Sequence, residues 1–279
     1  MNRREAIGAV LVTAYFLATA LGHLEVSLWL VERRHSDWLG DYQLVDFLPW
    51  VGAALVASFL VWQVWRAVRG DEFVATLSAW ALWLVAAAFV DRTLIYSLPE
   101  YLHYPQYALL AWLIARFADP DRSRWPFGPI LLATTLLGIA DEVLQYTWIT
   151  TSYSNYLDFN DFLLNLLGGF GGLMAYYGFR RAPERTVIHR QTRRGVIGFA
   201  GLGVALLLYT SIAHVLTPAG QPLIGLERET SYGLWISGPH AGRYFVLPPI
   251  PGTVLLTLAG AAIGLLPCID WSERRAAIR

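Results

Sequence analysis

The stretch "GIADEVLQYTWITTSYSNYLDFNDFLLNLLGGFGG", residues 138–172, places carboxylates inside segments that otherwise suit lipid. Apolar residues run up to Asp141 and Glu142 and resume after Asp161, and Asp158 lies in the connection between the two runs. A charged side chain deep in a bilayer raises the free energy of insertion by about 2.5–3.5 kcal/mol. The stretch therefore predicts two membrane helices whose carboxylates face protein or a water-filled cavity.

The whole chain has the composition of a membrane protein. It has 279 residues, of which 56% are hydrophobic, and its mean hydropathy is +0.43. Its apolar runs approach the ~20 residues that a helix needs to cross a bilayer. We expect an all-α, polytopic membrane protein with about eight transmembrane helices. They are expected near residues 7–27, 45–66, 73–92, 103–118, 129–150, 161–180, 195–216 and 245–267.

Arginine placement predicts the orientation of these helices. The chain contains no lysine, and all 21 basic residues are arginines. With the N-terminus inside, sixteen arginines fall in cytoplasmic segments and five fall outside. This is the bias of the positive-inside rule, so both termini are expected in the cytoplasm. External loops are then expected around 92–102, 151–160 and 217–244.

Three parts of the chain follow from this topology. Residues 1–70 would form an N-terminal transmembrane hairpin, 71–183 a four-helix core, and 184–279 a C-terminal hairpin with the external loop 217–244. A cleaved signal peptide is the alternative for the first segment, because "NRRE" precedes the apolar run and "LATALG" offers small residues for cleavage. Cleavage would leave the remaining topology unchanged.

Several classes of protein and motif are excluded or disfavoured. A net charge of +0 argues against a nucleic-acid-binding protein. The single cysteine, Cys268, rules out a disulfide within the chain. "GGFGG" at 168–172 follows no expected strand and precedes no Lys-Ser/Thr, so it favours close helix packing over phosphate binding.

Polar residues in the fifth and sixth expected helices repeat at helical spacing. Asp141 and Gln145 are four apart and Glu142 and Gln145 are three apart, so all three lie along one side of the fifth helix. Asp141 lies roughly 13 Å from the expected outer end of that helix, at 1.5 Å per residue. In the sixth helix, Asp161 and Asn165 begin a stripe that continues with two glycines.

The glycines of this stripe, Gly168 and Gly172, permit close approach of a neighbouring helix. Helix capping is the alternative role for Asp158 and for Asp161, which suits the positive end of the helix dipole.

A third stripe opens the fourth helix, in "PEYLHYPQY". Glu100, His103 and Tyr107 are three and then four residues apart. Because the fourth, fifth and sixth helices have their polar residues toward the same membrane face, we expect carboxylates, a histidine and amides to converge in the outer half of the bilayer.

These three elements resemble the VanZ-like family, which is named for a teicoplanin-resistance protein. Its members carry Glu-x-x-His-x-x-x-Tyr, then Asp-Glu-x-x-Gln, then Arg-x5-Asp-x-x-x-Asn-x-x-Gly. The matching residues are Glu100, His103, Tyr107, Asp141, Glu142, Gln145, Asp161, Asn165 and Gly168, within residues 73–183. Asn155 stands where the family usually has arginine, and the loop that precedes it is longer than usual.

The resemblance implies a multi-pass protein of the bacterial cytoplasmic membrane. Some family members are linked to lower sensitivity to glycopeptide antibiotics, but the resemblance supplies no reaction. The partners it implies are membrane lipid and either a lipid-linked envelope precursor or a glycopeptide. The oligomeric state stays open.

One hypothesis is that the protein is an enzyme that acts on a lipid-linked or envelope substrate. The residues alone do not decide whether it catalyses a reaction. A carboxylate and a histidine in a low-dielectric site can serve as an acid/base pair. The catalytic candidates are Glu142 as base, His103 as its partner or acid, Asp141 and Asp161. The substrate-binding candidates are Glu100, Tyr107, Gln145, Asn155 and Asn165. No cofactor is expected; a divalent metal on the four catalytic candidates is a variant, although no spacing specific to metal ligands is present.

Two other functions stay open. A transporter of a small solute or ion would also contain buried ionisable residues, although the inner half of the bundle shows no matching polar set. A non-catalytic membrane scaffold would use the same groups as a hydrogen-bond network, at only ~0.6–2 kcal/mol for each bond.

Overall fold

The computed structural model describes residues 3–32, 44–69, 73–149, 156–178, 185–213, 226, 232–238 and 242–268. Within these ranges the chain forms eight α-helices, which confirms the expected all-α class. The helices are α1 (Arg3–Glu32), α3 (Leu44–Val68), α4 (Phe73–Thr93), α5 (His103–Ala118), α6 (Phe127–Leu144), α7 (Phe159–Tyr177), α8 (Arg185–Ala213) and α9 (Pro249–Leu265). Short turns of other helix types are η1 (Leu98–Leu102), η2 (Gln145–Ile149) and η3 (Leu266–Cys268).

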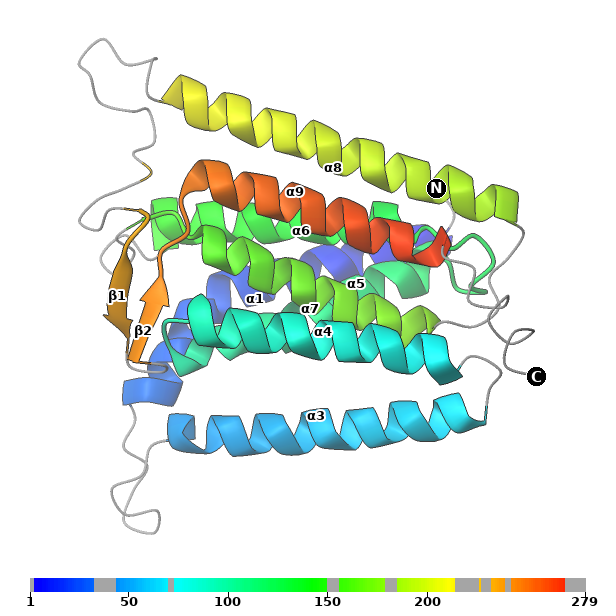
Figure 1. Cartoon of the computed structure of the whole chain (residues 1–279), viewed down its shortest axis with the longest axis horizontal. Coiled ribbons are helices and arrows are strands. Elements are labelled where there is room, and N and C mark those ends of the chain that lie inside the picture. Colours follow the sequence, from blue (N-terminus) through cyan, green and yellow to red (C-terminus); the bar gives the residue numbers. More distant parts are fainter. Residues whose placement is uncertain are drawn as a thin grey trace.

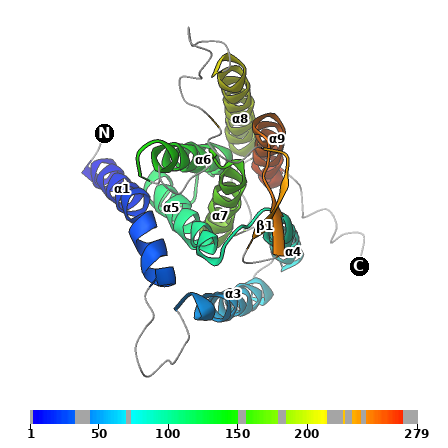
Figure 2. The ribbon, with the colours of Figure 1, turned by 90° about the vertical axis from the view of Figure 1, so that its left-hand side faces the viewer.

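The helices lie side by side along one direction, and successive helices run in opposite senses (Figure 1). Seen from one end, α5, α6 and α7 form the centre, and the other five helices surround them (Figure 2). Every residue of α7 except Ala175 is buried, so α7 is the most enclosed part of the bundle. The start of α1 and the end of α9 lie at the end of the bundle opposite the strands β1 and β2 (Figure 1).

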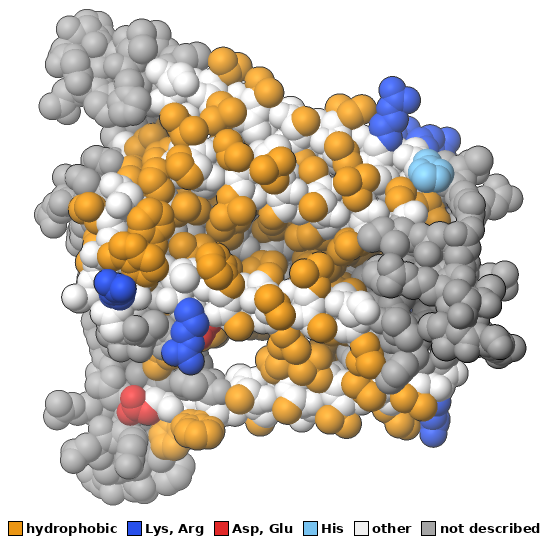
Figure 3. Space-filling view, viewed as in Figure 1, with side chains coloured by type: hydrophobic (Ala, Val, Ile, Leu, Met, Phe, Trp, Pro, Cys, Tyr) orange, Lys and Arg blue, Asp and Glu red, His pale blue; other side chains and the backbone are white. Residues whose placement is uncertain are grey.

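Among the described residues, four helical segments are long and apolar enough to cross a membrane: Arg3–Gly22, Phe127–Ile149, Ile188–Ser211 and Pro249–Cys268. Large apolar side chains also cover much of the outer surface, and arginines lie toward the two ends of the face drawn in Figure 3. A water-soluble protein generally keeps charged side chains at its surface, whereas here apolar side chains cover the exterior and charged ones are buried. By length and composition, the chain is a multi-pass membrane protein.

Glycine decides how closely α5 and α7 pack. A Cβ added at Gly168 would lie 2.9 Å from the carbonyl oxygen of Tyr104 and 3.0 Å from that of His103. A Cβ at Gly172 would overlap the backbone of Ala108. The expected close approach at these two glycines is therefore confirmed, and its partner is α5.

A small antiparallel hairpin, which the sequence analysis did not predict, covers one end of the bundle. It consists of β1 (Trp235–Gly238) and β2 (Gly242–Phe245), with Trp235 opposite Phe245. Asn160 of α7 anchors the segment that follows. Its Nδ2 donates to the carbonyl oxygens of Leu94 (2.9 Å) and Phe245 (2.9 Å), and its Oδ1 accepts from the backbone N–H of Leu247 (3.1 Å).

The fifth expected helix changes type near its end. It was expected to run to residue 150, but α6 ends at Leu144 and continues as a π-helical turn from Gln145 to Ile149. Such turns are rare and often occur at functional sites. The proposed division into parts at residues 70 and 183 stays a prediction.

Candidate functional site

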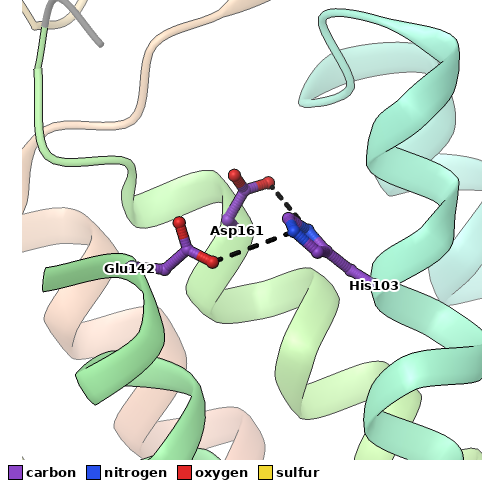
Figure 4. A group of neighbouring side chains, drawn as sticks. All are labelled: His103, Glu142 and Asp161. Atoms are coloured by element: carbon purple, nitrogen blue, oxygen red, sulfur yellow. Dashed lines mark ion pairs between the residues drawn. The ribbon is translucent and has the colours of Figure 1, made fainter. Parts of the chain in front are cut away.

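Three central helices each contribute one ionisable side chain to a buried cluster. His103 is the first residue of α5, Glu142 lies in the last turn of α6, and Asp161 lies in the first turn of α7 (Figure 4). The exposed fractions of the three residues are 1%, 5% and 9%, respectively. The expected convergence of the three helices is present, and none of these side chains faces lipid.

The imidazole of His103 lies between the two carboxylates. Its Nδ1 is 3.3 Å from Asp161 Oδ1, and its Nε2 is 3.9 Å from Glu142 Oε1 (Figure 4). One ring nitrogen is therefore paired with α7 and the other with α6. We call His103, Glu142 and Asp161 the His/Glu/Asp cluster.

Local structure before α5 fixes the position of His103. The turn η1 starts after Ser97, and the carboxylate of Glu100 accepts hydrogen bonds from the backbone N–H groups of Tyr96 (2.8 Å) and Ser97 (3.1 Å). Glu100 thus closes a capping box one turn ahead of α5. It lies in η1, outside the helix that carries His103 and Tyr107, and its expected role in substrate binding stays a prediction.

The start of α7 is fixed by Asp158. Its carboxylate accepts a hydrogen bond from the backbone N–H of Asn160 at 2.7 Å, which confirms its capping role. This residue lies outside the membrane-spanning segments. Burial and the nearby Asp161 carboxylate raise the pKa of Asp158 to about 8.

Asp141 is fully buried but pairs with different groups from those of Glu142. Its Oδ2 accepts hydrogen bonds from the hydroxyl of Tyr107 (2.5 Å) and from Nε2 of Gln106 (3.2 Å), both in α5. Tyr107 thus contacts a carboxylate, while its predicted part in substrate binding stays a prediction. Asp141 therefore joins α6 to α5 beside the His/Glu/Asp cluster.

Asn165 joins α7 to α6 at the same level. Its Nδ2 donates to Glu142 Oε1 at 3.3 Å, and the residue is fully buried. This approach depends on Gly138 of α6, where an added Cβ would lie 3.0 Å from Asn165 Cβ and 3.2 Å from the Tyr107 ring. Gly138 thus leaves the space in which the tyrosine and the amide meet the carboxylates.

Gln145 and Asn155 are the two remaining substrate-binding candidates. Gln145 is buried at the first position of the π-helical turn, one helical turn beyond Asp141. Asn155 lies outside the described residues. Their predicted part in substrate binding is not tested by the contacts above.

Sequence reasoning missed Gln106 and Asp119, and it considered Asn160 only as a possible helix cap. Gln106 donates to Asp141, and its position three residues after His103 in α5 was the available signal. Asn160 anchors the hairpin segment through long-range bonds that no local pattern indicates. Buried Asp119, at the opposite end of the bundle, accepts bonds from the backbone N–H groups of Ser123 and Trp125 and so organises the turn before α6.

Comparison with protein-family models, with curated proteins and with solved structures gives no match. The fold and the site therefore define the class by themselves. The chain is a helical, multi-pass membrane protein with a buried cluster of histidine, glutamate and aspartate at one end of its central helices.

Proposed function

We propose that the chain is a VanZ-like protein of the bacterial cytoplasmic membrane that acts on or binds a lipid-linked or other cell-envelope substrate at the outer face. The observation that carries the proposal is the position of His103, which is buried between Asp161 and Glu142 at the hairpin end of the bundle. Buried ionisable groups in a membrane protein generally mark a functional site. Four of the motif residues that resemble the family support the proposal by their positions, since His103, Glu142, Asp161 and Asn165 contact one another here.

The proposed topology has eight transmembrane helices with both termini in the cytoplasm. Alternating helix directions support it, because they place the start of α1 and the end of α9 at one end and the hairpin at the other (Figure 1). Exposed Arg190, Arg193 and Arg194 near the start of α8 supply positive charge at the end proposed as cytoplasmic. The His/Glu/Asp cluster then lies toward the outer face.

The geometry supports acid/base chemistry in the enzymatic form of this proposal. An imidazole titrates near neutral pH, so His103 can exchange a proton with a neighbouring carboxylate. Glu142 would act as the base and His103 as its partner, while Asp161 and Asn165 orient them. In the non-catalytic form, the same polar groups would bind the substrate without reaction.

A lipid-linked substrate also fits the surface. Figure 3 shows an opening between α3 and α4, with apolar side chains along part of its border. An opening between helices that face lipid would admit an acyl chain of such a substrate. A transport path is less well supported, because the acidic residue buried at the opposite end, Asp119, is occupied by backbone donors of its own loop.

The test is the substitution Glu142→Gln, which keeps the size of the side chain and removes the titratable group. We expect a folded protein in detergent and a loss of the envelope phenotype, read as sensitivity of cells to a glycopeptide. Asp91→Asn is the matched control, because Asp91 is a carboxylate of α4 that is not a member of the His/Glu/Asp cluster and pairs with Arg92 and the hydroxyl of Tyr101. If Glu142→Gln matches wild type in yield and in sensitivity, the proposal is wrong for this residue.

A second variant, Glu142→Leu, tests the alternative that the cluster is only a structural scaffold. If the cluster only holds helices together, Glu142→Gln is tolerated, and Glu142→Leu lowers folded yield because Asn165 loses its acceptor. Measuring both variants side by side separates a site from a scaffold.

A further inference from the structure

The buried carboxylates around His103 have too little positive charge to balance them among the described residues, because the His103 imidazole is the one basic group paired with them. Asp141, Glu142 and Asp161 are all buried, and in the part of the chain that the structure describes no arginine pairs with any of them. The hydrogen-bond donors that reach Asp141 and Glu142 belong to neutral side chains. One imidazole can neutralise at most one carboxylate, and buried charges are stable only when they are compensated.

The His/Glu/Asp cluster has the shape of a cation site. One ligand atom from each of the three residues lies within 4.8 Å of the other two. Ligand distances of about 2.0–2.2 Å around zinc place neighbouring ligand atoms roughly 3.3 Å apart. His103 Nδ1 and Asp161 Oδ1 are already 3.3 Å apart, so the cation would use Nδ1 of His103. Glu142 lies on the Nε2 side of the ring and needs the larger adjustment.

A buried amide oxygen adjoins the same space. Asn165 is fully buried, its Nδ2 donates to Glu142 Oε1, and its Oδ1 has no hydrogen-bond partner among the described residues. Buried polar atoms are normally satisfied, so such an atom beside a carboxylate pair indicates an additional positively charged or hydrogen-bonding group. The unsatisfied Asn165 oxygen is an observation independent of the unbalanced charge of the carboxylates.

We propose that His103, Glu142 and Asp161 together bind one divalent cation of the zinc or manganese type. Mixed imidazole and carboxylate ligands suit these ions, whereas magnesium and calcium prefer oxygen ligands alone. The cation would deepen the proposed function at the same site, because it would neutralise the two carboxylate ligands and offer an open coordination position to a phosphate oxygen of a lipid headgroup. With the cation bound, the three side chains would act as its ligands, so this inference rests on the substrate-binding form of the proposed function and replaces the acid/base roles of Glu142 and His103.

The experiment uses the full-length protein, purified in detergent, stripped with a chelator and titrated with Zn²⁺ or Mn²⁺ alone. Cys268 Sγ lies 3.7 Å from His189 Nδ1 and is a second place where a soft metal can bind, so the reference protein carries Cys268→Ser and His189→Gln. We expect about one equivalent of metal by mass spectrometry after desalting. Binding should also raise the melting temperature, because it favours the folded state.

Three single variants of this reference protein assign the site: His103→Gln, Glu142→Gln and Asp161→Asn. Each removes one ligand, and we expect affinity to fall about 100-fold or more, beyond the effect of losing a supporting group. Asp91→Asn is the control and should bind like the reference. The proposal is overturned if the reference protein takes up neither ion, or if folded ligand variants bind as tightly as it does.

The metal test and the functional test can fail separately. Metal binding is measured without a substrate, so one bound equivalent with unchanged glycopeptide sensitivity in Glu142→Gln cells removes the proposed function alone. Loss of the phenotype without metal uptake removes the cation alone.

Discussion

Gly168 of α7 lies against the backbone of His103 in α5, with only 3.0 Å between the His103 carbonyl oxygen and the place that a Cβ on Gly168 would occupy. The same two helices carry the ion pair between His103 and Asp161. Close packing at the glycine therefore brings the two charged groups within reach of each other.

We expect Gly168→Leu to force α5 and α7 apart and to lower the free energy of unfolding by about 1–3 kcal/mol. The measurement is thermal stability and folded yield in detergent. Gly201→Leu is the control, because Gly201 of α8 has nothing within 4 Å of an added Cβ. Equal stability of the two variants would show that the α5–α7 contact tolerates a larger residue.

Two tyrosines of α5 provide a matched test of the Asp141 hydrogen bond. Tyr107→Phe removes the hydroxyl that donates to Asp141 Oδ2, and we expect a loss of about 1–3 kcal/mol because a buried acceptor loses its closest donor. Tyr104→Phe should be nearly neutral, since the Tyr104 hydroxyl has no hydrogen-bond partner among the described residues. Equal effects of the two substitutions would mean that the Asp141 contact adds little stability.

Topology can be tested at the hairpin. Ser237 of β1 is exposed, so Ser237→Cys in a Cys268→Ser background gives a single reporter thiol. We expect a membrane-impermeant maleimide to label it in intact cells, whereas Cys268 of the unaltered chain should react only after permeabilisation. Protection of the Ser237→Cys thiol in intact cells would reverse the proposed orientation.

Stability should depend on pH through Asp158. Its pKa is raised from 3.8 to about 8 by burial and by the Asp161 carboxylate, so the folded chain binds this proton more tightly than the unfolded chain does. The free energy of unfolding contributed by this proton is therefore fully present below about pH 4 and is lost as pH rises through about 8.

Asp158→Asn isolates this effect. An amide oxygen can still accept the capping bond from Asn160 but does not titrate, so the melting temperature of the variant should fall less between pH 5 and 9 than that of wild type. Parallel pH curves for the two proteins would assign the dependence to other groups.

Helix positions were largely predictable because they depend on local composition. The fourth helix was expected at 103–118 and is His103–Ala118, and the third was expected at 73–92 and is Phe73–Thr93. The seventh helix was expected to start at residue 195, but α8 starts ten residues earlier, at Arg185. Hydropathy indicates only the part of a helix that lies in lipid. The arginine-rich turns before that part are also helical, because arginine has a high helix propensity.

Spacing and order in the sequence determined that His103, Glu142 and Asp161 would lie at one end of three neighbouring helices. Only the tertiary structure decided that the imidazole pairs with Glu142 and Asp161, while Asp141 pairs with Tyr107 and Gln106. The choice depends on how each helix is rotated about its axis. That rotation is set by long-range packing, above all at the glycines of α7. The bonds of Asn160 to Phe245 of β2 and to Leu247 also fix it, and no local sequence pattern indicates these bonds.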